Sequence, residues 1–146
     1  MQPITETKQP LNIFMVEDNP GDITLAENAF RKSKYSVNLV TVLNGEHALM
    51  MLRRQLEADK NKLPHLILLD LNLPVVSGHE VLETIKKDHD LKHIPVVILS
   101  SSDAIPDIET ATKNKASAYI VKPKSMVELR QLVVEVDNFW DSWQGR

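Results

Sequence analysis

Short apolar segments alternate along the chain with longer segments whose apolar residues recur at helical spacing. Five segments rich in leucine and β-branched residues are predicted to be strands: 11–16, 37–43, 66–69, 96–99 and 118–121. The segments that follow them are predicted to be helices: 22–33, 46–56, 78–88, 103–115 and 125 to about 143. Apolar runs of this length suit strands that are buried on both faces, as parallel strands are. The alternation predicts a doubly wound α/β fold with right-handed crossovers.

A polar stretch, Glu57-Ala58-Asp59-Lys60-Asn61-Lys62, follows the second predicted helix. We interpret it as a solvated loop, because it is too short to form a domain of its own. The chain of 146 residues fits one domain of ordinary size. We expect a flexible N-terminus over residues 1–10, a single domain over 11–143 and a short tail over 144–146.

Polar side chains follow four of the five predicted strands, at the point where each strand ends. They are Glu17 and Asp18 after the first strand, Asp70 after the third, Ser100 after the fourth and Lys122 after the fifth. In open α/β sheets the ligand site lies outside the carboxyl ends of the strands. Each of these residues alone could be a helix cap or an ordinary loop residue. Together they predict a chemical site at one edge of the sheet.

Three carboxylates and an ammonium define the chemistry of this predicted site. Carboxylates a few ångströms apart repel one another unless a cation neutralises them or one is protonated. Ligands that are all oxygen suit a hard cation, and Mg²⁺ (or Mn²⁺) fits a site with few carboxylates. Because Lys122 adds positive charge, the pocket suits a phosphoryl group beside one carboxylate. Asp70 would attack phosphorus and form an acyl phosphate.

At these residues the chain resembles the receiver domains of two-component response regulators. The resemblance runs from Leu11 to about Phe139 and includes VEDNPGD (16–22), LLDLNLPVVSG (68–78), VVILSSS (96–102) and YIVKP (119–123). It implies a flavodoxin-like fold, a five-stranded parallel sheet in the order 2-1-3-4-5 with helices on both faces. It also implies a single-domain regulator that accepts a phosphoryl group from a sensor histidine kinase and switches its protein–protein contacts.

A narrower resemblance concerns the kinase partner. The segment EDNPGD, the longer loop after the second predicted helix and the late Phe-Trp pair are similar to stand-alone regulators of bacterial phytochrome-like kinases. This similarity implies a phytochrome-type sensor histidine kinase as the phosphodonor.

The resemblance also implies how the carboxylates divide their roles. Asp70 is the phosphoacceptor, and Asp18 is a direct Mg²⁺ ligand. Glu17 acts through a bound water, although its longer reach also allows direct contact with the metal. The backbone carbonyl of Asn72 completes the protein ligands. Many receivers have two aspartates where this chain has Glu17 and Asp18, and the substitution keeps the carboxylate.

The other half of the implied site receives the phosphoryl group. Ser100, where many receivers have threonine, hydrogen-bonds a phosphoryl oxygen, and Lys122 pairs with the phosphoryl charge. Tyr119 is the aromatic residue that turns inward as Ser100 moves. The peptide bond between Lys122 and Pro123 is expected to be cis, a form that is readily accessible only before proline.

The last predicted helix carries more apolar residues than one packed face requires. One stripe at alternating steps of three and four fits packing on the sheet: Met126, Leu129, Val133, Val136, Trp140 and Trp143. Four more apolar residues lie off that stripe: Val127, Leu132, Val134 and Phe139. A helix that is apolar over most of its circumference is either deeply buried or covered by a partner.

We therefore expect a two-fold homodimer formed by this helix region. The residues predicted for its surface are Val127, Val134, Phe139, Trp140 and Trp143. The alternative is a monomer that exposes the same helix to a downstream target.

Composition narrows the remaining classes of partner. A net charge of −3, with no run of basic residues longer than two, argues against nucleic acid. The absence of cysteine excludes disulfides and cysteine nucleophiles. No apolar run approaches the roughly 20 residues of a membrane span, and the polar start MQPITETKQP lacks the apolar centre of a signal peptide. We expect a cytoplasmic protein without a membrane partner.

Two other functions of the same fold class are open at this point. An aspartyl-phosphate hydrolase needs a general acid two residues after its nucleophile, where this chain has Asn72, and a cap for which the chain is short. A flavin- or nucleotide-binding module needs a phosphate-binding loop, whereas the loop at 18–22 carries two acids. We therefore expect no small-molecule substrate beyond the phosphodonor, and no enzymatic activity beyond self-catalysed phosphotransfer and hydrolysis.

Overall fold

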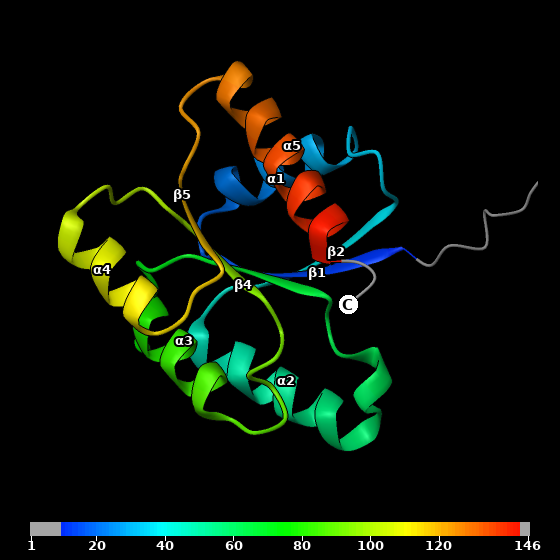
Figure 1. Ribbon diagram of the computed structural model, residues 1–146, viewed down its shortest axis with the longest axis vertical. Helices are drawn as coiled ribbons and strands as arrows, with labels where there is room; N and C mark the ends of the chain where they lie inside the picture. The colour runs from blue at the N-terminus through cyan, green and yellow to red at the C-terminus, as the bar shows by residue number, and fades with distance from the viewer. Residues whose placement is uncertain (1–9, 144–146) are drawn as a thin grey trace, which may run out of the picture.

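The structure is a computed structural model that describes residues 10–143, without the side chains of Met126 and Trp143. Apart from Pro10, the predicted flexible N-terminus and the predicted tail lie outside the described residues. Figure 1 shows the described chain as a central sheet with helices packed on both of its faces.

Five parallel strands form the sheet: β1 (Leu11–Val16), β2 (Val37–Val42), β3 (Leu66–Leu69), β4 (Val96–Ser100) and β5 (Ala118–Val121). Their order is β2-β1-β3-β4-β5, which confirms the doubly wound, flavodoxin-like prediction. In the register of the centre, Ile13 of β1 pairs with Leu66 of β3 and Val16 with Leu69. The strand order reverses between β1 and β3, so the carboxyl ends of these two strands flank the switch point where a ligand is expected.

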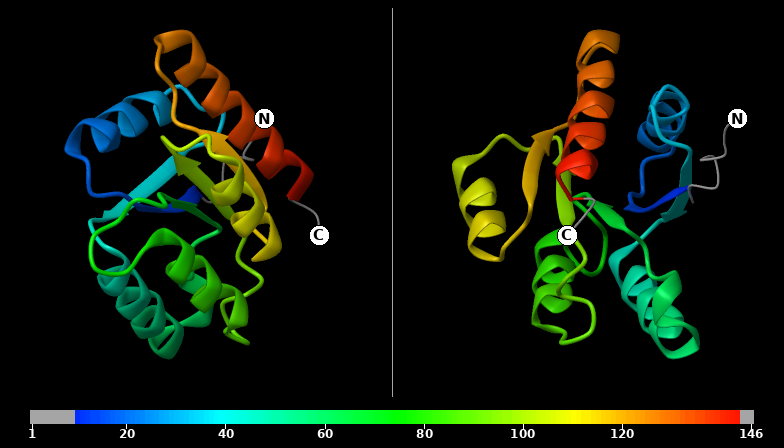
Figure 2. Two further views of the ribbon diagram at one scale, coloured as in Figure 1. Left: turned by 90° about the vertical axis from the view of Figure 1, so that its left-hand side faces the viewer. Right: turned by 45° about the vertical axis from the view of Figure 1, so that its right-hand side comes forward.

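Five α-helices connect the strands: α1 (Pro20–Phe30), α2 (Gly45–Ala58), α3 (Gly78–Lys87), α4 (Ile105–Lys113) and α5 (Met126–Trp143). Figures 1 and 2 show α1 and α5 on one face of the sheet and α2, α3 and α4 on the other. Each predicted strand and helix is present, with ends that differ from the prediction by up to three residues.

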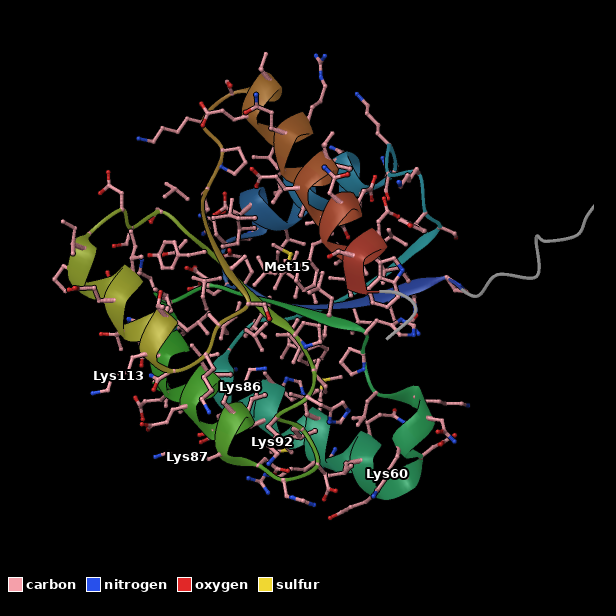
Figure 3. All side chains as sticks on the ribbon, viewed as in Figure 1. Met15, Lys60, Lys86, Lys87, Lys92 and Lys113 are labelled. Carbon is pink, nitrogen blue, oxygen red and sulfur yellow. The ribbon has the colours of Figure 1, made fainter. Side chains whose placement is uncertain are left out.

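The strands separate two apolar layers because their side chains alternate between the faces. Met15, Leu68 and Val97 pack beneath α1 and α5. Phe14 and Ile98 pack on the other face, beneath α2, α3 and α4. Figure 3 shows this contrast: Met15 lies inside, whereas lysines such as Lys87 and Lys113 extend from the outer helices.

Residues 57–62 are largely exposed, as predicted, but their interpretation as a loop is wrong. Helix α2 continues to Ala58, and a short 3₁₀ turn, η2 (Lys60–Lys62), follows it. The Asp59 side chain accepts a hydrogen bond from the Asn61 backbone N–H at 2.9 Å, which caps this turn. Leu63 directly after it is buried in the core. Polar composition misled the prediction, because a side-chain cap and one buried leucine suffice to order the stretch.

Candidate functional site

The carboxyl ends of β1 and β3 bring three carboxylates together. Glu17 and Asp18 directly follow β1, and Asp70 directly follows β3. Each residue offers one oxygen atom, and these three atoms lie within 4.8 Å of one another. Glu17 and Asp70 are buried, whereas Asp18 is exposed. The acidic cluster expected from the strand ends is therefore present in the described part of the chain.

The turn between β1 and α1 orients Glu17. Asn19 caps α1, because its side chain accepts a hydrogen bond from the Asp22 backbone N–H at 3.0 Å. Pro20 occupies the first helical position, where no N–H is needed. With the turn fixed in this way, the Asn19 backbone N–H donates to Glu17 Oε2 at 3.1 Å. The segment VEDNPGD thus supplies both acids and the cap that holds them.

The turn between β3 and α3 orients Asp70. Asp70 Oδ1 accepts a hydrogen bond from the Asn72 backbone N–H at 3.2 Å. The first residue of α3 is Gly78, whose backbone N–H donates to the Leu71 carbonyl at 3.0 Å. Only glycine allows this approach, because a Cβ on Gly78 would lie 2.1 Å from the Asp70 carbonyl oxygen.

Lys122, directly after β5, brings its ammonium into the cluster. Its Nζ lies 3.2 Å from Asp70 Oδ2 and 2.9 Å from Glu17 Oε1. It also lies 2.7 Å from Asp22 Oδ2, a residue to which the sequence interpretation gave no role in the site. Burial would lower the pKa of Lys122, but its contacts with the Asp22 and Glu17 carboxylates outweigh burial and raise the pKa. The sequence could have indicated this role for Asp22, because the first turn of α1 lies at the same edge of the sheet as the other site residues.

The prediction of a cis bond between Lys122 and Pro123 is wrong, since no peptide bond among the described residues is cis. Trans is the lower-energy form even before proline. The Lys122 backbone N–H donates to the Ser100 carbonyl at 2.8 Å. With this bond in place, the ammonium still reaches Asp70.

The electrostatics of Glu17 fit a bound cation. Burial raises the pKa of Glu17 to about 7, although contact with Lys122 lowers it. Glu17 Oε1 is buried and receives no hydrogen bond, because the nearby Lys122 ammonium lies outside hydrogen-bonding geometry. A buried carboxylate oxygen without a donor is costly unless a cation is present. All side-chain ligands are oxygen, so Glu17, Asp18 and Asp70 suit Mg²⁺ or Mn²⁺.

Ser100 and Tyr119 lie together beside the loop between β4 and α4. Ser100 is fully buried, and its Oγ accepts a hydrogen bond from the Ser102 backbone N–H at 3.2 Å. The Tyr119 hydroxyl donates to the Ser102 carbonyl at 2.7 Å. Both residues predicted to sense the phosphoryl group therefore contact the same loop residue.

The same loop is tied to two helices by a contact that sequence reasoning missed. Ser102 Oγ donates to Asp107 Oδ2 at 2.5 Å, and His79 Nε2 lies 3.0 Å from Asp107 Oδ1. The hydroxyl of Ser102 and the ring of His79 lower the pKa of Asp107. Because His79 belongs to α3 and Asp107 to α4, this cluster couples the loop beside Ser100 to both helices.

The surface predicted on α5 is only partly available to a partner. Val127 and Val134 are exposed, by 60% and 55%. Trp140 is 8% exposed and packs in the core, with its ring centroid 5.2 Å from that of His65, so its assignment to a partner surface is wrong. Phe139 is half-buried against the same core. The side chain of Trp143 lies outside what the structure describes.

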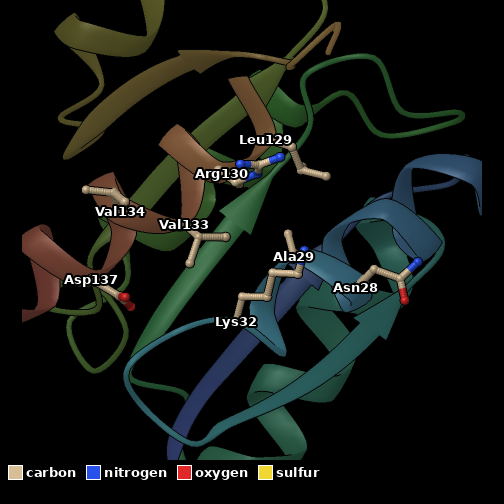
Figure 4. Close-up of a pocket in the computed structure, with 8 residues that line it drawn as sticks. All are labelled: Asn28, Ala29, Lys32, Leu129, Arg130, Val133, Val134 and Asp137. Atoms are coloured by element: carbon tan, nitrogen blue, oxygen red, sulfur yellow. The ribbon is translucent and has the colours of Figure 1, made fainter. Parts of the chain in front are cut away.

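A hollow of about 250 Å³ lies between α1 and α5 (Figure 4). Its walls are apolar at Ala29, Leu129 and Val133, and Lys32 and Arg130 add positive charge. None of its lining residues belongs to the acidic cluster. It is therefore a surface feature separate from the site at the sheet edge.

Five parallel strands in this order, with an acidic cluster and a lysine at their carboxyl ends, define a phosphoryl-receiving switch domain. The response regulator receiver domain matches residues 13–134 of the chain. The chain therefore belongs to the receiver domain family of response regulators, which are signalling proteins.

Several full-length relatives are similar to the chain. The probable methanogenesis regulatory protein FilR2 of Methanothrix harundinacea is 36% identical, over 96% of this chain and 90% of its own. The response regulator Rcp1 of Synechocystis is 35% identical, over 92% of each chain.

Solved structures agree with this assignment. The phosphorylated cyanobacterial phytochrome response regulator RcpA is 42% identical, over 92% of this chain and 96% of its own, with a TM-score of 0.82. The Mn²⁺-bound form of Rcp1 has a TM-score of 0.79 over 90% of this chain and 94% of its own, at 35% identity. None of the described helices is long and apolar enough to span a bilayer.

Proposed function

We propose that Asp70 is the phosphoacceptor of a single-domain response regulator. The observation that carries this proposal is that Asp70 belongs to the carboxylate cluster suited to a cation and also lies 3.2 Å from the Lys122 ammonium. An Asp70 oxygen forms a bond to phosphorus as the bond from phosphorus to a histidine nitrogen of the kinase breaks. That nitrogen keeps the electron pair, and the histidine leaves as a neutral imidazole because its other ring nitrogen carries a proton. A Mg²⁺ ion held by these carboxylates would supply positive charge beside the acceptor and the transferred group.

The surrounding residues divide the work of this transfer. Glu17 and Asp18, with the backbone carbonyl of Asn72, hold the cation beside Asp70. Lys122 pairs with the negative charge of the phosphoryl group, and Ser100 donates its hydroxyl to a phosphoryl oxygen. This division is supported by the burial of Glu17, the reach of Lys122 and the position of Ser100 at the same sheet edge.

Tyr119 belongs to the readout of this site. Its hydroxyl donates a hydrogen bond to the Ser102 carbonyl. A movement of the loop that follows Ser100 would therefore lengthen or break the hydrogen bond that holds the Tyr119 ring. We propose that this coupling carries the phosphorylation state toward β5 and α5, where the protein meets its partners. A ligand shifts such an equilibrium only by binding one state more tightly than the other.

Incubation with acetyl phosphate and Mg²⁺ tests the phosphoacceptor. We expect the protein to gain one phosphoryl group, seen as a mass increase, and Asp70→Asn to gain none. Asp103→Asn removes an exposed aspartate three residues after Ser100 and is the matched control, which should be labelled normally. Labelling of Asp70→Asn at the rate of the unmodified protein would contradict the proposal.

We further propose a phytochrome-type sensor histidine kinase as the phosphodonor. The similarity to RcpA, a phytochrome response regulator, supports this partner. The similarity to FilR2 supports a different input, because that relative is named for regulation of methanogenesis. Transfer from a phosphorylated phytochrome-type kinase within seconds, against minutes from an unrelated kinase, would distinguish the two inputs.

The output is proposed to pass through protein contacts of a homodimer in the cytoplasm, without a nucleic-acid, membrane or small-molecule partner. Val127 and Val134 support the dimer, because exposed valines on one helix are suited to a self-complementary interface. We propose no enzymatic activity beyond the transfer to Asp70 and the hydrolysis of its acyl phosphate. Solution mass, with and without beryllofluoride, tests the dimer.

A further inference from the structure

Asp22 contacts the Lys122 ammonium more closely than the pocket carboxylates do. Asp22 Oδ2 lies 2.7 Å from Lys122 Nζ, against 2.9 Å for Glu17 Oε1 and 3.2 Å for Asp70 Oδ2. Among the described residues, the acidic cluster suited to a cation consists of Glu17, Asp18 and Asp70, without Asp22. Asp22 is therefore a further carboxylate that pairs with the lysine and stays outside the cation site.

The first turn of α1 fixes Asp22 in this position. The Asp22 backbone N–H donates to Asn19 Oδ1, and Pro20 restricts the backbone between them. A helix N-terminus also stabilises a negative side chain in its first turn. The side chains of Lys122 and Asp22 are 16% and 32% exposed, so water screens their attraction less than it screens a surface ion pair.

The charges near Lys122 change when the site is loaded. A divalent cation in the cluster would take up the charge of the carboxylates that hold it, whereas Asp22 lies outside that cluster and pairs with Lys122. A phosphoryl group on Asp70 then adds further negative charge. The single ammonium of Lys122 must serve both the phosphoryl group and Asp22.

We propose that Asp22 is a positioning residue that holds Lys122 at the pocket and, by sharing its positive charge, weakens the affinity of the pocket for a phosphoryl group. This inference rests on the proposed phosphorylation of Asp70. Asp22 acts through Lys122 and does not contact the reacting atoms. Its effect is to lower the fraction of protein that stays phosphorylated at a given supply of phosphodonor.

Beryllofluoride binding with saturating Mg²⁺ tests the inference. We expect Asp22→Asn, which keeps the side-chain shape but removes the charge, to bind beryllofluoride about three- to tenfold more tightly. Labelling by acetyl phosphate should reach half its maximum at a correspondingly lower donor concentration. Asp22→Glu should return both values toward those of the unmodified protein.

Glu27→Gln is the matched control, because it removes one negative charge from an exposed position of the same helix. It should leave beryllofluoride affinity within about twofold. A damaged fold lowers affinity, so a gain in Asp22→Asn cannot come from misfolding. Unchanged or weaker binding in Asp22→Asn, or an equal gain in Glu27→Gln, overturns the inference. Failure of the unmodified protein to bind beryllofluoride or accept label overturns the phosphorylation proposal itself.

Discussion

Gly78 and Asp70 approach so closely that no side chain fits between them. A Cβ on Gly78 would lie 2.1 Å from the Asp70 carbonyl oxygen and 2.5 Å from the Leu71 Cα. Both contacts are with backbone, which cannot rotate away as a flexible side chain can. The start of α3 can therefore pack against the backbone of the proposed phosphoacceptor only because residue 78 is a glycine.

Gly78→Ala should destabilise the protein by about 2–3 kcal/mol, because the backbone around Asp70 must shift to accept the methyl group. Urea denaturation measures the loss. Gly21→Ala is the control, since its Cβ would meet only Asn19 Oδ1, at 3.2 Å. An equal loss in the two variants would show that the close approach to Asp70 is not the cause.

Much of this architecture could be predicted from the sequence. Runs such as Leu66–Leu69 are apolar without interruption because both faces of a central parallel strand are buried, and this pattern gave the strands. From the strand ends we could then predict that Glu17, Asp18 and Asp70 lie at one edge of the sheet, although no side-chain position was known. These predictions succeeded because topology alone determines which strand ends meet.

Other features depend on three-dimensional packing that the sequence pattern does not contain. Asp22 looks like any acid in a first helical turn, and its contact with Lys122 joins residues from opposite ends of the chain. The pair His79 and Asp107 likewise joins two different helices, α3 and α4, which the sequence pattern does not bring together. Trp140 lies on a helix that is apolar over most of its circumference, so the sequence allows it to pack either on the core or on a partner. Only the structure assigns it to the core.

Mg²⁺ affinity should rise steeply between pH 6 and pH 8. Burial raises the pKa of Glu17 to about 7 in the metal-free protein, so the group must lose a proton before it can join a cation site. Below pH 7 the affinity should fall by up to about tenfold per pH unit. Calorimetry in buffers of different ionisation enthalpy measures the proton released.

Stability of the metal-free protein should follow the opposite trend. The folded-state pKa of Glu17 lies above its usual value of 4.5, so its contribution to stability is complete below pH 4.5 and is lost as pH rises through about 7. Glu17→Gln should remove this pH dependence of stability and of Mg²⁺ affinity alike. A pH profile of Mg²⁺ affinity that survives in Glu17→Gln would assign the effect to another group.

Asp107→Ala should loosen the loop between β4 and α4. The substitution removes the acceptor of the Ser102 hydroxyl and the partner of His79, which together tie the loop to α3 and α4. Amide hydrogen exchange over residues 101–105 should accelerate about tenfold, a local effect. Glu109→Ala removes an exposed acid from the same helix and should leave this exchange unchanged. Equal acceleration in both variants would point to fraying of α4 itself.

Val134→Glu should weaken the proposed homodimer without unfolding the protein. Val134 is 55% exposed, so a charge there is tolerated in the monomer but is costly when a partner covers it. Sedimentation with and without beryllofluoride measures the shift toward monomer. Met50→Glu, at an exposed position of α2 on the opposite face, should leave the mass unchanged. A dimer that is unaffected by Val134→Glu would place the interface elsewhere.

Trp140→Ala should instead act on stability. The indole is 8% exposed and packs against the His65 ring, the sheet and the rest of the core beneath α5. Its removal leaves a cavity and should cost about 3–5 kcal/mol in urea denaturation. Val134→Ala is the control, because it shortens an exposed side chain of the same helix. It should change stability by about 0.5 kcal/mol or less. The contrary outcome would be a Trp140→Ala variant that keeps its stability and loses only its dimer. Trp140 would then face a partner, and α5 would pack on the sheet differently from the packing described above.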